Sequence, residues 1–245
     1  MMKIDQQLEN YILAHTIGED PVLRRLYRET HLRLVNGRMC SGHLQGSLLT
    51  FFSKMISPKR ILEIGTYTGY SAICLAKGLP VGGKLHTIEI NDELEEFAAS
   101  YFAETGLKGC IIQHIGDATD ILPKLNEQFE LAFLDADKRQ YLSHYELILP
   151  KITPGGLLIA DNTLWGGKIV GKIARNDEQT LAILAFNDFI KSDPRVEATI
   201  LPLRDGMTLI RKIYTYTPDR FPKPDRCKFR LLPSYSIQIA LTYGI

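Results

Sequence analysis

Apolar residues follow a helical period over the first part of the chain. The pattern predicts helix over 3–36, broken near residue 18, and a second helix over 42–56 that the Ser57-Pro58 pair ends. Asp20 followed by Pro21 is typical of a helix start, with a capping carboxylate and a proline in the first turn. The apolar positions that carry the first segment are Leu8, Ile12, Leu23, Leu26 and Leu34.

From residue 60 onward, short apolar runs alternate with helical segments. Alternation of this kind predicts a parallel sheet covered by helices on both faces, which is an α/β fold. The last two runs are joined by a short turn at 204–206, which predicts an antiparallel pair. The predicted strands are 60–64, 84–90, 110–115, 129–134, 156–160, 196–201 and 207–213. The predicted helices are 71–79, 92–105, 118–125, 141–149 and 176–192.

Composition narrows the class of protein. With 245 residues, 45% hydrophobic and 23% charged, the chain has enough apolar material for one large core without disulfide or metal support. A net charge of +1 argues against bulk attraction to DNA. The longest charge-free stretch, 231–245, is interrupted by polar residues and is too short to span a membrane. The four scattered cysteines form no C-x-x-C pair, so we expect a reducing, cytoplasmic setting.

The chain continues beyond the last predicted strand. Residues 234–245 alternate strictly between apolar and small or polar side chains, a period-two pattern that predicts a strand with one buried face. Prolines in the preceding linker prevent it from continuing the final strand pair. We therefore expect a domain over 1–212, with N-terminal helices at 3–56 and an α/β core at 60–212, and a docked, strand-like extension over 213–245. A disordered tail is the alternative.

Ligands of parallel α/β sheets bind at the carboxyl ends of the strands, so the residues there are the candidates for chemistry. The first strand ends in the segment from Glu63 to Ser71, with glycines at 65 and 69. Such a turn lets the backbone approach a ligand, although a plain tight turn has the same composition. Tyr67 occupies the place of a glycine in the NAD-binding fingerprint, which favours a ligand without a pyrophosphate.

Two acidic residues follow the next two strands. Glu89, roughly 20 residues beyond the glycine turn, suits the hydroxyls of a ribose; a surface glutamate is the alternative. Asp117 suits either an adenine amino group or the N-cap of the following helix.

The fourth and fifth strands end in Asp135 and in Asp161-Asn162. Their oxygens suit Mg²⁺, with Mn²⁺ or Ca²⁺ possible, and do not suit zinc. Helix capping is the alternative for each residue alone. Lys138 lies three residues beyond Asp135, where it could act as a base; a surface lysine is its commoner fate.

In these motifs the chain resembles the cation-dependent, S-adenosylmethionine-dependent O-methyltransferases, the group of caffeoyl-CoA and catechol O-methyltransferases with their bacterial relatives. The matching segments, in family order, are 39–46, 63–71, 133–138, Tyr141, 161–165 and 203–207. The resemblance covers roughly residues 5 to 212 and implies a Rossmann-like fold with a seven-stranded, mostly parallel sheet and an antiparallel last strand.

The resemblance also implies roles for individual residues. Lys138 corresponds to the catalytic lysine, and Asp135, which also contacts the cofactor, joins Asp161 and Asn162 as a metal ligand. Trp165 corresponds to an aromatic residue that packs on the acceptor ring, with a core tryptophan as the alternative. The remaining cofactor-binding positions are Met39, Ser41, Glu63, Gly65, Tyr67, Ser71, Glu89, Asp117 and Ala118.

The expected reaction is methyl transfer from S-adenosylmethionine to a hydroxyl of a catechol-like or phenolic small molecule. A divalent cation lowers the pKa of that hydroxyl, and Lys138 takes its proton or stabilises the oxyanion. Methylation of tRNA hydroxyuridine is an alternative, because arginines at 24, 25, 28, 33 and 38 could grip phosphates. A homodimer is expected.

Three other classes of protein are disfavoured. A nicotinamide oxidoreductase conflicts with Tyr67 and with the Asp161-Asn162 pair. A serine hydrolase would need a G-x-S-x-G elbow, which the chain lacks. A binding module without catalysis would not need Lys138 beside an intact set of metal ligands.

Overall fold

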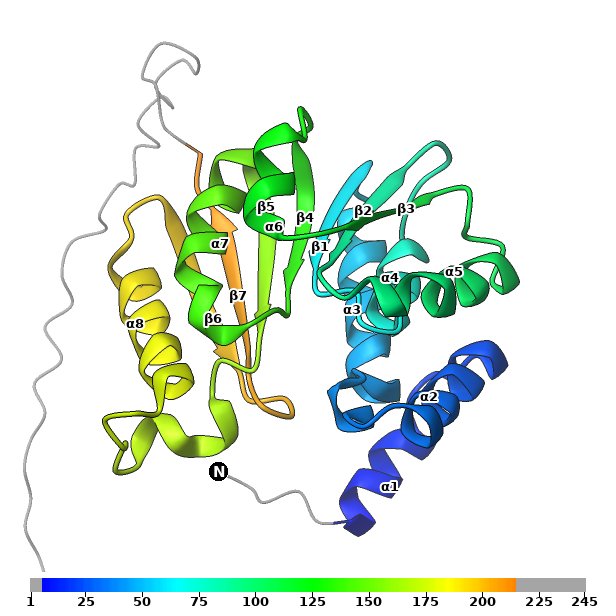
Figure 1. Ribbon diagram of the computed structural model, residues 1–245, viewed down its shortest axis with the longest axis horizontal. Coiled ribbons are helices and arrows are strands. Elements are labelled where there is room, and N and C mark those ends of the chain that lie inside the picture. The colour runs from blue at the N-terminus through cyan, green and yellow to red at the C-terminus, as the bar shows by residue number, and fades with distance from the viewer. Residues whose placement is uncertain (1–5, 215–245) are drawn as a thin grey trace, which may run out of the picture. The chain divides into compact units, whose positions relative to one another are not determined.

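The structure, a computed structural model, describes residues 6–214. Its strands form one seven-stranded sheet in the order β3-β2-β1-β4-β5-β7-β6, in which β7 alone runs opposite to the other six strands (Figure 1). The strands are β1 (Arg60–Ile64), β2 (Lys84–Glu89), β3 (Ile111–Ile115), β4 (Phe129–Leu134), β5 (Ile152–Asp161), β6 (Val196–Leu201) and β7 (Met207–Lys212). The predicted α/β sheet with an antiparallel last strand is confirmed.

Helices cover both faces of the sheet (Figure 1). One face carries α3 (Gly42–Ile56), α4 (Tyr70–Ala76) and α5 (Glu95–Glu104). The other carries α6 (Ala118–Ile121), α7 (Tyr141–Ile148) and α8 (Glu178–Ser192). The N-terminal helices are α1 (Gln6–Ala14) and α2 (Pro21–Arg33). They lie outside the helices α3, α4 and α5, and α2 contacts all three. Short 3-10 helices are η1 (Gly37–Met39), η2 (Asp92–Leu94), η3 (Leu122–Lys124), η4 (Lys138–Gln140), η5 (Leu149–Lys151) and η6 (Trp165–Val170).

The sheet separates two hydrophobic cores. Leu26, Leu49 and Phe102 belong to the core on the α3–α5 side, and Tyr145 and Phe186 belong to the core on the α6–α8 side. The central strands β1 and β4 are largely buried on both faces, which explains why their sequences are mostly apolar, apart from Arg60 and Glu63 in β1 and Glu130 in β4. Burial of these runs stabilises the sheet by roughly 25 cal/mol per Å² of apolar surface.

The strand register brings the candidate residues together at the carboxyl ends of the central strands. Ile64 pairs with Leu134, and Leu134 pairs with Ala160. The residues that follow these three positions therefore leave neighbouring strands at the same level, about 5 Å apart. Gly65, Asp135 and Asp161 are brought together in this way.

Local signals placed most element boundaries within a few residues. The predicted start of α2 is confirmed, because the side chain of Asp20 accepts a hydrogen bond of 2.9 Å from the backbone N of Val22. The predicted start of β5 at residue 156 was wrong, since the strand begins at Ile152. Its early part contains a proline and two glycines, which disfavour strand, and the pairing with β4 shifts register between Phe129 and Leu131.

Residues 1–5 and 215–245 lie outside the described part of the chain, and so does the predicted strand at 234–245. The expected boundary at residue 212 stays a prediction; the structure has a compact unit that ends at Tyr214. Among residues 6–214, no helix is long and apolar enough to cross a membrane.

Candidate active site

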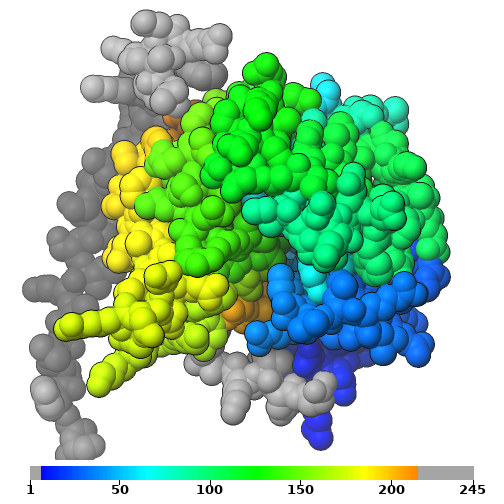
Figure 2. Space-filling view, in the orientation of Figure 1, coloured from blue at the N-terminus to red at the C-terminus, as the bar shows by residue number. Residues whose placement is uncertain are grey.

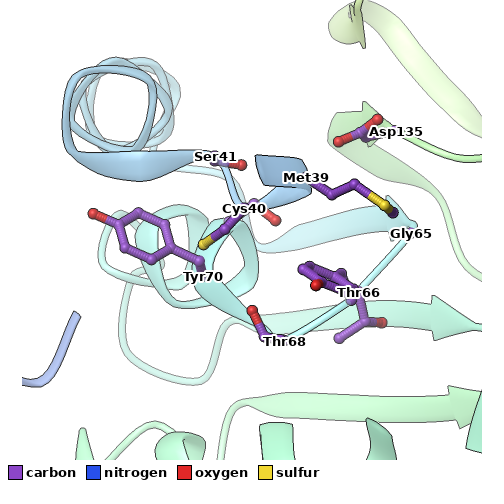
Figure 3. Close-up of a pocket in the computed structure, with 10 residues that line it drawn as sticks. Met39, Cys40, Ser41, Gly65, Thr66, Thr68, Tyr70 and Asp135 are labelled. Carbon is purple, nitrogen blue, oxygen red and sulfur yellow. The ribbon is translucent and has the colours of Figure 1, made fainter. Parts of the chain in front are cut away.

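A cavity lies where β1 turns into α4. It lies between this turn and the segment that precedes α3, and its free space, counted together with the adjoining open solvent, is about 320 Å³ (Figure 3). The side chain of Met39 extends over the cavity toward Gly65 (Figure 3). The lining residues are Met39, Cys40, Ser41, Gly65, Thr66, Tyr67, Thr68, Tyr70, Ser71 and Asp135.

The turn after β1 has a backbone conformation that its sequence explains. Gly65 has φ +99°, and a Cβ atom there would lie 1.9 Å from the carbonyl oxygen of Asp135. Only glycine therefore permits β1 and β4 to approach this closely. Tyr67 has φ +48°, which is rare for a residue with a side chain. A hydrogen bond of 2.7 Å from its backbone N to Oε2 of Glu89 holds this conformation.

Glu63 is a fully buried carboxyl behind the turn. Its Oε2 accepts a 2.5 Å hydrogen bond from the hydroxyl of Thr87, whereas its Oε1 has no partner among the described residues. Burial raises the pKa of Glu63 to about 8, against the lowering influence of Ser71 and Thr87. The negative charges of Asp135 and Glu89 raise this pKa further. An unpartnered buried carboxyl oxygen of this kind calls for a polar partner, and a positively charged ligand nearby would favour the ionised carboxylate.

The acidic residues after β2 and β3 differ in what they already bind. Glu89 accepts hydrogen bonds from the backbone N of Tyr67 and of Asn91 (3.0 Å). Asp117 is the N-cap of α6, and its Oδ1 accepts from both the backbone N and the hydroxyl of Thr119 at 2.7 Å. The capping alternative for Asp117 is thus observed, and neither Asp117 nor Ala118 lines the cavity.

Lys138 is buried beside Asp135. Its Nζ donates to Oδ1 of Asp135 and to the hydroxyl of Tyr141, both at 2.7 Å. The Tyr141 hydroxyl in turn donates to the backbone oxygen of Asp161 at 2.9 Å. Lys138 is only 6% exposed, whereas most lysines lie on the protein surface, so the surface-lysine alternative is wrong.

Asp161 and Asn162 end β5 beside this cluster. Asp161 is 4% exposed, and its Oδ2 accepts a 2.6 Å hydrogen bond from Nε2 of Gln45. Burial and then the negative charge of Asp135 raise the pKa of Asp161 to about 6. Asn162 has φ +55°, another conformation that is rare outside glycine. No group of three or more His, Cys, Asp or Glu side chains suited to a metal ion occurs in residues 6–214. The expected ligand set contains only two carboxylates, those of Asp135 and Asp161, beside the amide of Asn162.

Trp165 begins the loop that follows Asn162. It is half-buried, has φ +47°, and its Nε1 has no partner in the described part of the chain. The Nζ of Lys168 lies 6.0 Å from the centre of its ring and 3.6 Å from a carboxylate oxygen of Asp177.

The structure therefore brings most of the predicted site residues to one edge of the sheet. Sequence reasoning missed Gln45 and Arg204, which bind to each other and to the site. Both lie in segments that the motifs included, 39–46 and 203–207, but neither residue type signals the contact. It also missed the cavity-lining residues Cys40, Thr66, Thr68 and Tyr70.

Comparison with known proteins decides the family. A family model described as O-methyltransferase matches residues 13–213. The chain belongs to the O-methyltransferase family. A caffeoyl-CoA O-methyltransferase of Stellaria longipes is 30% identical over 223 residues, covering 85% of this chain and 91% of that protein. A caffeoyl-CoA O-methyltransferase of Eucalyptus gunnii is 35% identical over 219 residues, covering 84% and 87%.

Solved O-methyltransferase structures share the fold. TomG of Streptomyces achromogenes, an O-methyltransferase of tomaymycin synthesis solved with S-adenosylmethionine, superimposes with a TM-score of 0.78 at 30% identity, covering 85% of this chain and 96% of that one. An O-methyltransferase of Bacillus cereus solved with S-adenosylhomocysteine gives 0.75 at 27% identity, covering 84% and 97%. The expected family and enzyme class are confirmed, and the nicotinamide oxidoreductase and the serine hydrolase are set aside.

Proposed function

We propose that this O-methyltransferase moves the methyl group of S-adenosylmethionine to a hydroxyl of a catechol-like or phenolic small molecule, with the help of a divalent cation. The observation that carries the proposal is the hydrogen-bonded cluster of buried Lys138 and Tyr141 with Asp135, which lines the cavity at the β1 turn.

The cavity fits the cofactor in chemistry. S-adenosylmethionine carries a positive sulfonium and a positive ammonium group, and the unpartnered Oε1 of buried Glu63 supports a cationic ligand nearby. Met39 and Ser41 would cover the methionine end, and Gly65, Tyr67 and Ser71 would form the floor. Glu89 would accept the ribose hydroxyls, and Asp117 with Ala118 would contact the adenine. The cofactor-bound structural relatives support this assignment.

The strand ends beyond the cavity fit a hard cation. Asp135, Asp161 and Asn162 offer only oxygen donors, which favours Mg²⁺ over softer metals. The charge of Asp135 raises the pKa of Asp161, so the two carboxylates repel each other, and a cation between them would relieve that repulsion. When bound, the cation would lower the pKa of the acceptor hydroxyl and fix its orientation.

The chain's own groups would then complete the transfer. Lys138 would take the proton of the acceptor hydroxyl at Nζ, or donate a hydrogen bond to the oxyanion. Tyr141 and Asp135 hold Nζ in place from two sides, so the lysine reaches the reaction pre-oriented. Trp165 would pack against the acceptor ring. The main work of the protein is to place oxygen and methyl carbon in line.

A phenolic acceptor is supported by the names of the curated relatives, which are caffeoyl-CoA O-methyltransferases. The tRNA alternative finds less support. Of the arginines that could grip phosphates, Arg24, Arg25 and Arg33 form ion pairs with Glu19, Glu104 and Glu29. A cytoplasmic setting is supported by Cys40, Cys74 and Cys110, which are free. The homodimer stays a prediction that light scattering will test.

The test is a methyl-transfer assay with catechols, phenolic acyl-CoA esters and tRNA, each with Mg²⁺ and with EDTA. We expect transfer to a phenolic hydroxyl, lost in EDTA, while calorimetry shows that cofactor binding persists after chelation. Full activity in EDTA would refute the cation, and transfer to tRNA alone would refute the phenolic acceptor.

A further inference from the structure

The turn between β6 and β7 grips the segment that covers the cavity. The guanidinium of Arg204 donates from Nη1 to the backbone oxygen of Ser41 and, at 2.7 Å, to Oε1 of Gln45. The same nitrogen lies 3.3 Å from the backbone oxygen of Cys40, and Nη2 donates to that of Arg38 at 3.4 Å. One side chain thus holds four groups of residues 38–45, two of which belong to cavity-lining residues.

Gln45 passes this contact on to Asp161. The glutamine is 1% exposed, its Oε1 accepts from Arg204, and its Nε2 donates to Oδ2 of Asp161 at 2.6 Å. Arginine can only donate and an ionised carboxylate can only accept, so the orientation of the amide between them is fixed. A single buried side chain therefore connects the guanidinium to the strand end that we assign to the cation.

The next residues of the same turn hold the loop that contains Trp165. The carboxylate of Asp205 accepts from the backbone N of Gly166, and its backbone oxygen accepts from Leu164 at 2.9 Å. The backbone oxygen of Gly206 accepts from Thr163 at 3.1 Å. In Figures 1 and 2 the tip of this turn, in orange, lies between the blue N-terminal segment and the yellow-green loop after β5.

Non-glycine residues with positive φ, a strained backbone conformation, occur mainly in the segments that this turn connects. Five non-glycine residues among 6–214 have positive φ. Four of them belong to the cavity turn, the end of β5, the following loop and the clamping turn itself: Tyr67, Asn162, Trp165 and Arg204. Such conformations persist only where surrounding contacts hold them, and they concentrate at functional sites.

We propose that Arg204 is a positioning residue that couples filling of the cofactor cavity to the placement of Asp161 and of the Trp165 loop. This inference rests on the proposed function. When cofactor fills the cavity and residues 38–41 close on it, Arg204 and Gln45 fix Asp161, and Asp205 fixes the loop that packs on the acceptor. Coupling between two sites is reciprocal. Loss of Arg204 therefore weakens cofactor binding, and the loop that contains Trp165 no longer responds to that binding.

Trp165 provides a direct readout, because it is the only tryptophan of the chain and does not line the cavity. Its emission therefore reports the loop rather than contact with the cofactor. The measurement is the change in emission when S-adenosylhomocysteine saturates the metal-free protein, alongside the dissociation constant from calorimetry. The matched control is Arg211→Met, which removes an exposed arginine of β7 that forms an ion pair with Glu197 and lies over the ring of Tyr214, without contacting residues 38–45 or Asp161 in the described part of the chain.

We expect Arg204→Met to weaken binding of S-adenosylhomocysteine ~10-fold and to abolish the emission change at saturation. Gln45→Met, a substitution of similar shape, should abolish the emission change as well. The double variant should bind S-adenosylhomocysteine no more weakly than the single variant with the lower affinity, because both substitutions remove the same contact. Arg211→Met should match the wild type in both measurements.

Two results would overturn the inference alone: a wild-type protein that binds S-adenosylhomocysteine without any emission change, or an Arg204→Met variant with wild-type affinity and response. An Arg204→Met variant that lowers only the melting temperature would show a structural role and nothing more. A wild-type protein that does not bind S-adenosylhomocysteine would instead refute the proposed function itself.

Discussion

Gly65 and Asp135 are in backbone contact: a Cβ atom on Gly65 would lie 1.9 Å from the carbonyl oxygen of Asp135. The first residue lines the turn assigned to the cofactor, and the second begins the segment assigned to the cation and to Lys138. The two halves of the reaction are thus fixed relative to each other by main chain, not by flexible side chains. Placement of this kind is what an in-line methyl transfer requires.

Gly65→Ala should therefore displace both the turn assigned to the cofactor and the segment assigned to the cation and Lys138. The substitution combines the strain of φ +99° with a clash that only a backbone shift relieves, so we expect kcat/KM to fall ~10²-fold or more. Gly106→Ala is the matched control, since its φ is +72° but nothing lies within 4 Å of the added carbon. It should lose stability of ~1 kcal/mol through strain and keep its activity. Equal activity in the two variants would refute the role of the contact.

Glu63 should make the cofactor-free protein less stable as pH rises. Its pKa is about 8 when folded against 4.5 as the ordinary value, so the folded state binds the extra proton between these limits. Stability is highest below the lower pKa and declines as pH rises through the upper one. Glu63→Gln should remove this decline and exceed the wild type in unfolding free energy at alkaline pH, by on the order of 2–4 kcal/mol. Chemical denaturation from about pH 5 to about pH 9 measures it. Parallel profiles for the two proteins would contradict the assignment.

The sequence predicted the parts of this site that follow from local pattern. A buried parallel strand shows as a continuous apolar run, and the polar residue that ends it, such as Asp135 or Asp161, then identifies the ligand edge. The contacts of Gln45 were not predictable in this way, because its partners Arg204 and Asp161 lie 159 and 116 residues away. Only the packing of α3 against the end of the sheet brings them together. The dual possibility for Asp117 could not be decided either, since a cap and an adenine contact need the same carboxylate.

Lys138→Met should lower kcat ~10²-fold with little change in the dissociation constant of S-adenosylhomocysteine, since a lost general base has this typical cost. Methionine keeps the packing of the buried stem, so the loss is one of chemistry. Tyr141→Phe removes one of the two groups that hold Nζ and should lower kcat by a smaller factor, ~10-fold. Lys151→Met is the control, as that lysine donates to the backbone oxygen of Leu125 at the opposite edge of the sheet. If Lys138→Met keeps near wild-type kcat across the neutral and alkaline range, the lysine has no part in proton transfer.

Glu89→Ala should weaken cofactor binding and also lower the stability of the cofactor-free protein, because the carboxylate already holds the backbone N of Tyr67 and of Asn91. Losing hydrogen bonds to a charged acceptor costs ~1.5–3 kcal/mol, and we expect a loss of this size both in the free energy of cofactor binding and in the free energy of unfolding. Glu89→Gln separates the two effects, since its amide oxygen can still accept from Tyr67 while the negative charge for the ribose hydroxyls is gone. Asp193→Ala is the matched control: its buried carboxylate holds the backbone N of Arg195 at 2.8 Å just before β6, at the edge of the sheet away from the cavity. It should lower the melting temperature and leave the dissociation constant unchanged. Should Glu89→Ala behave like Asp193→Ala in both measurements, another acidic residue must bind the ribose.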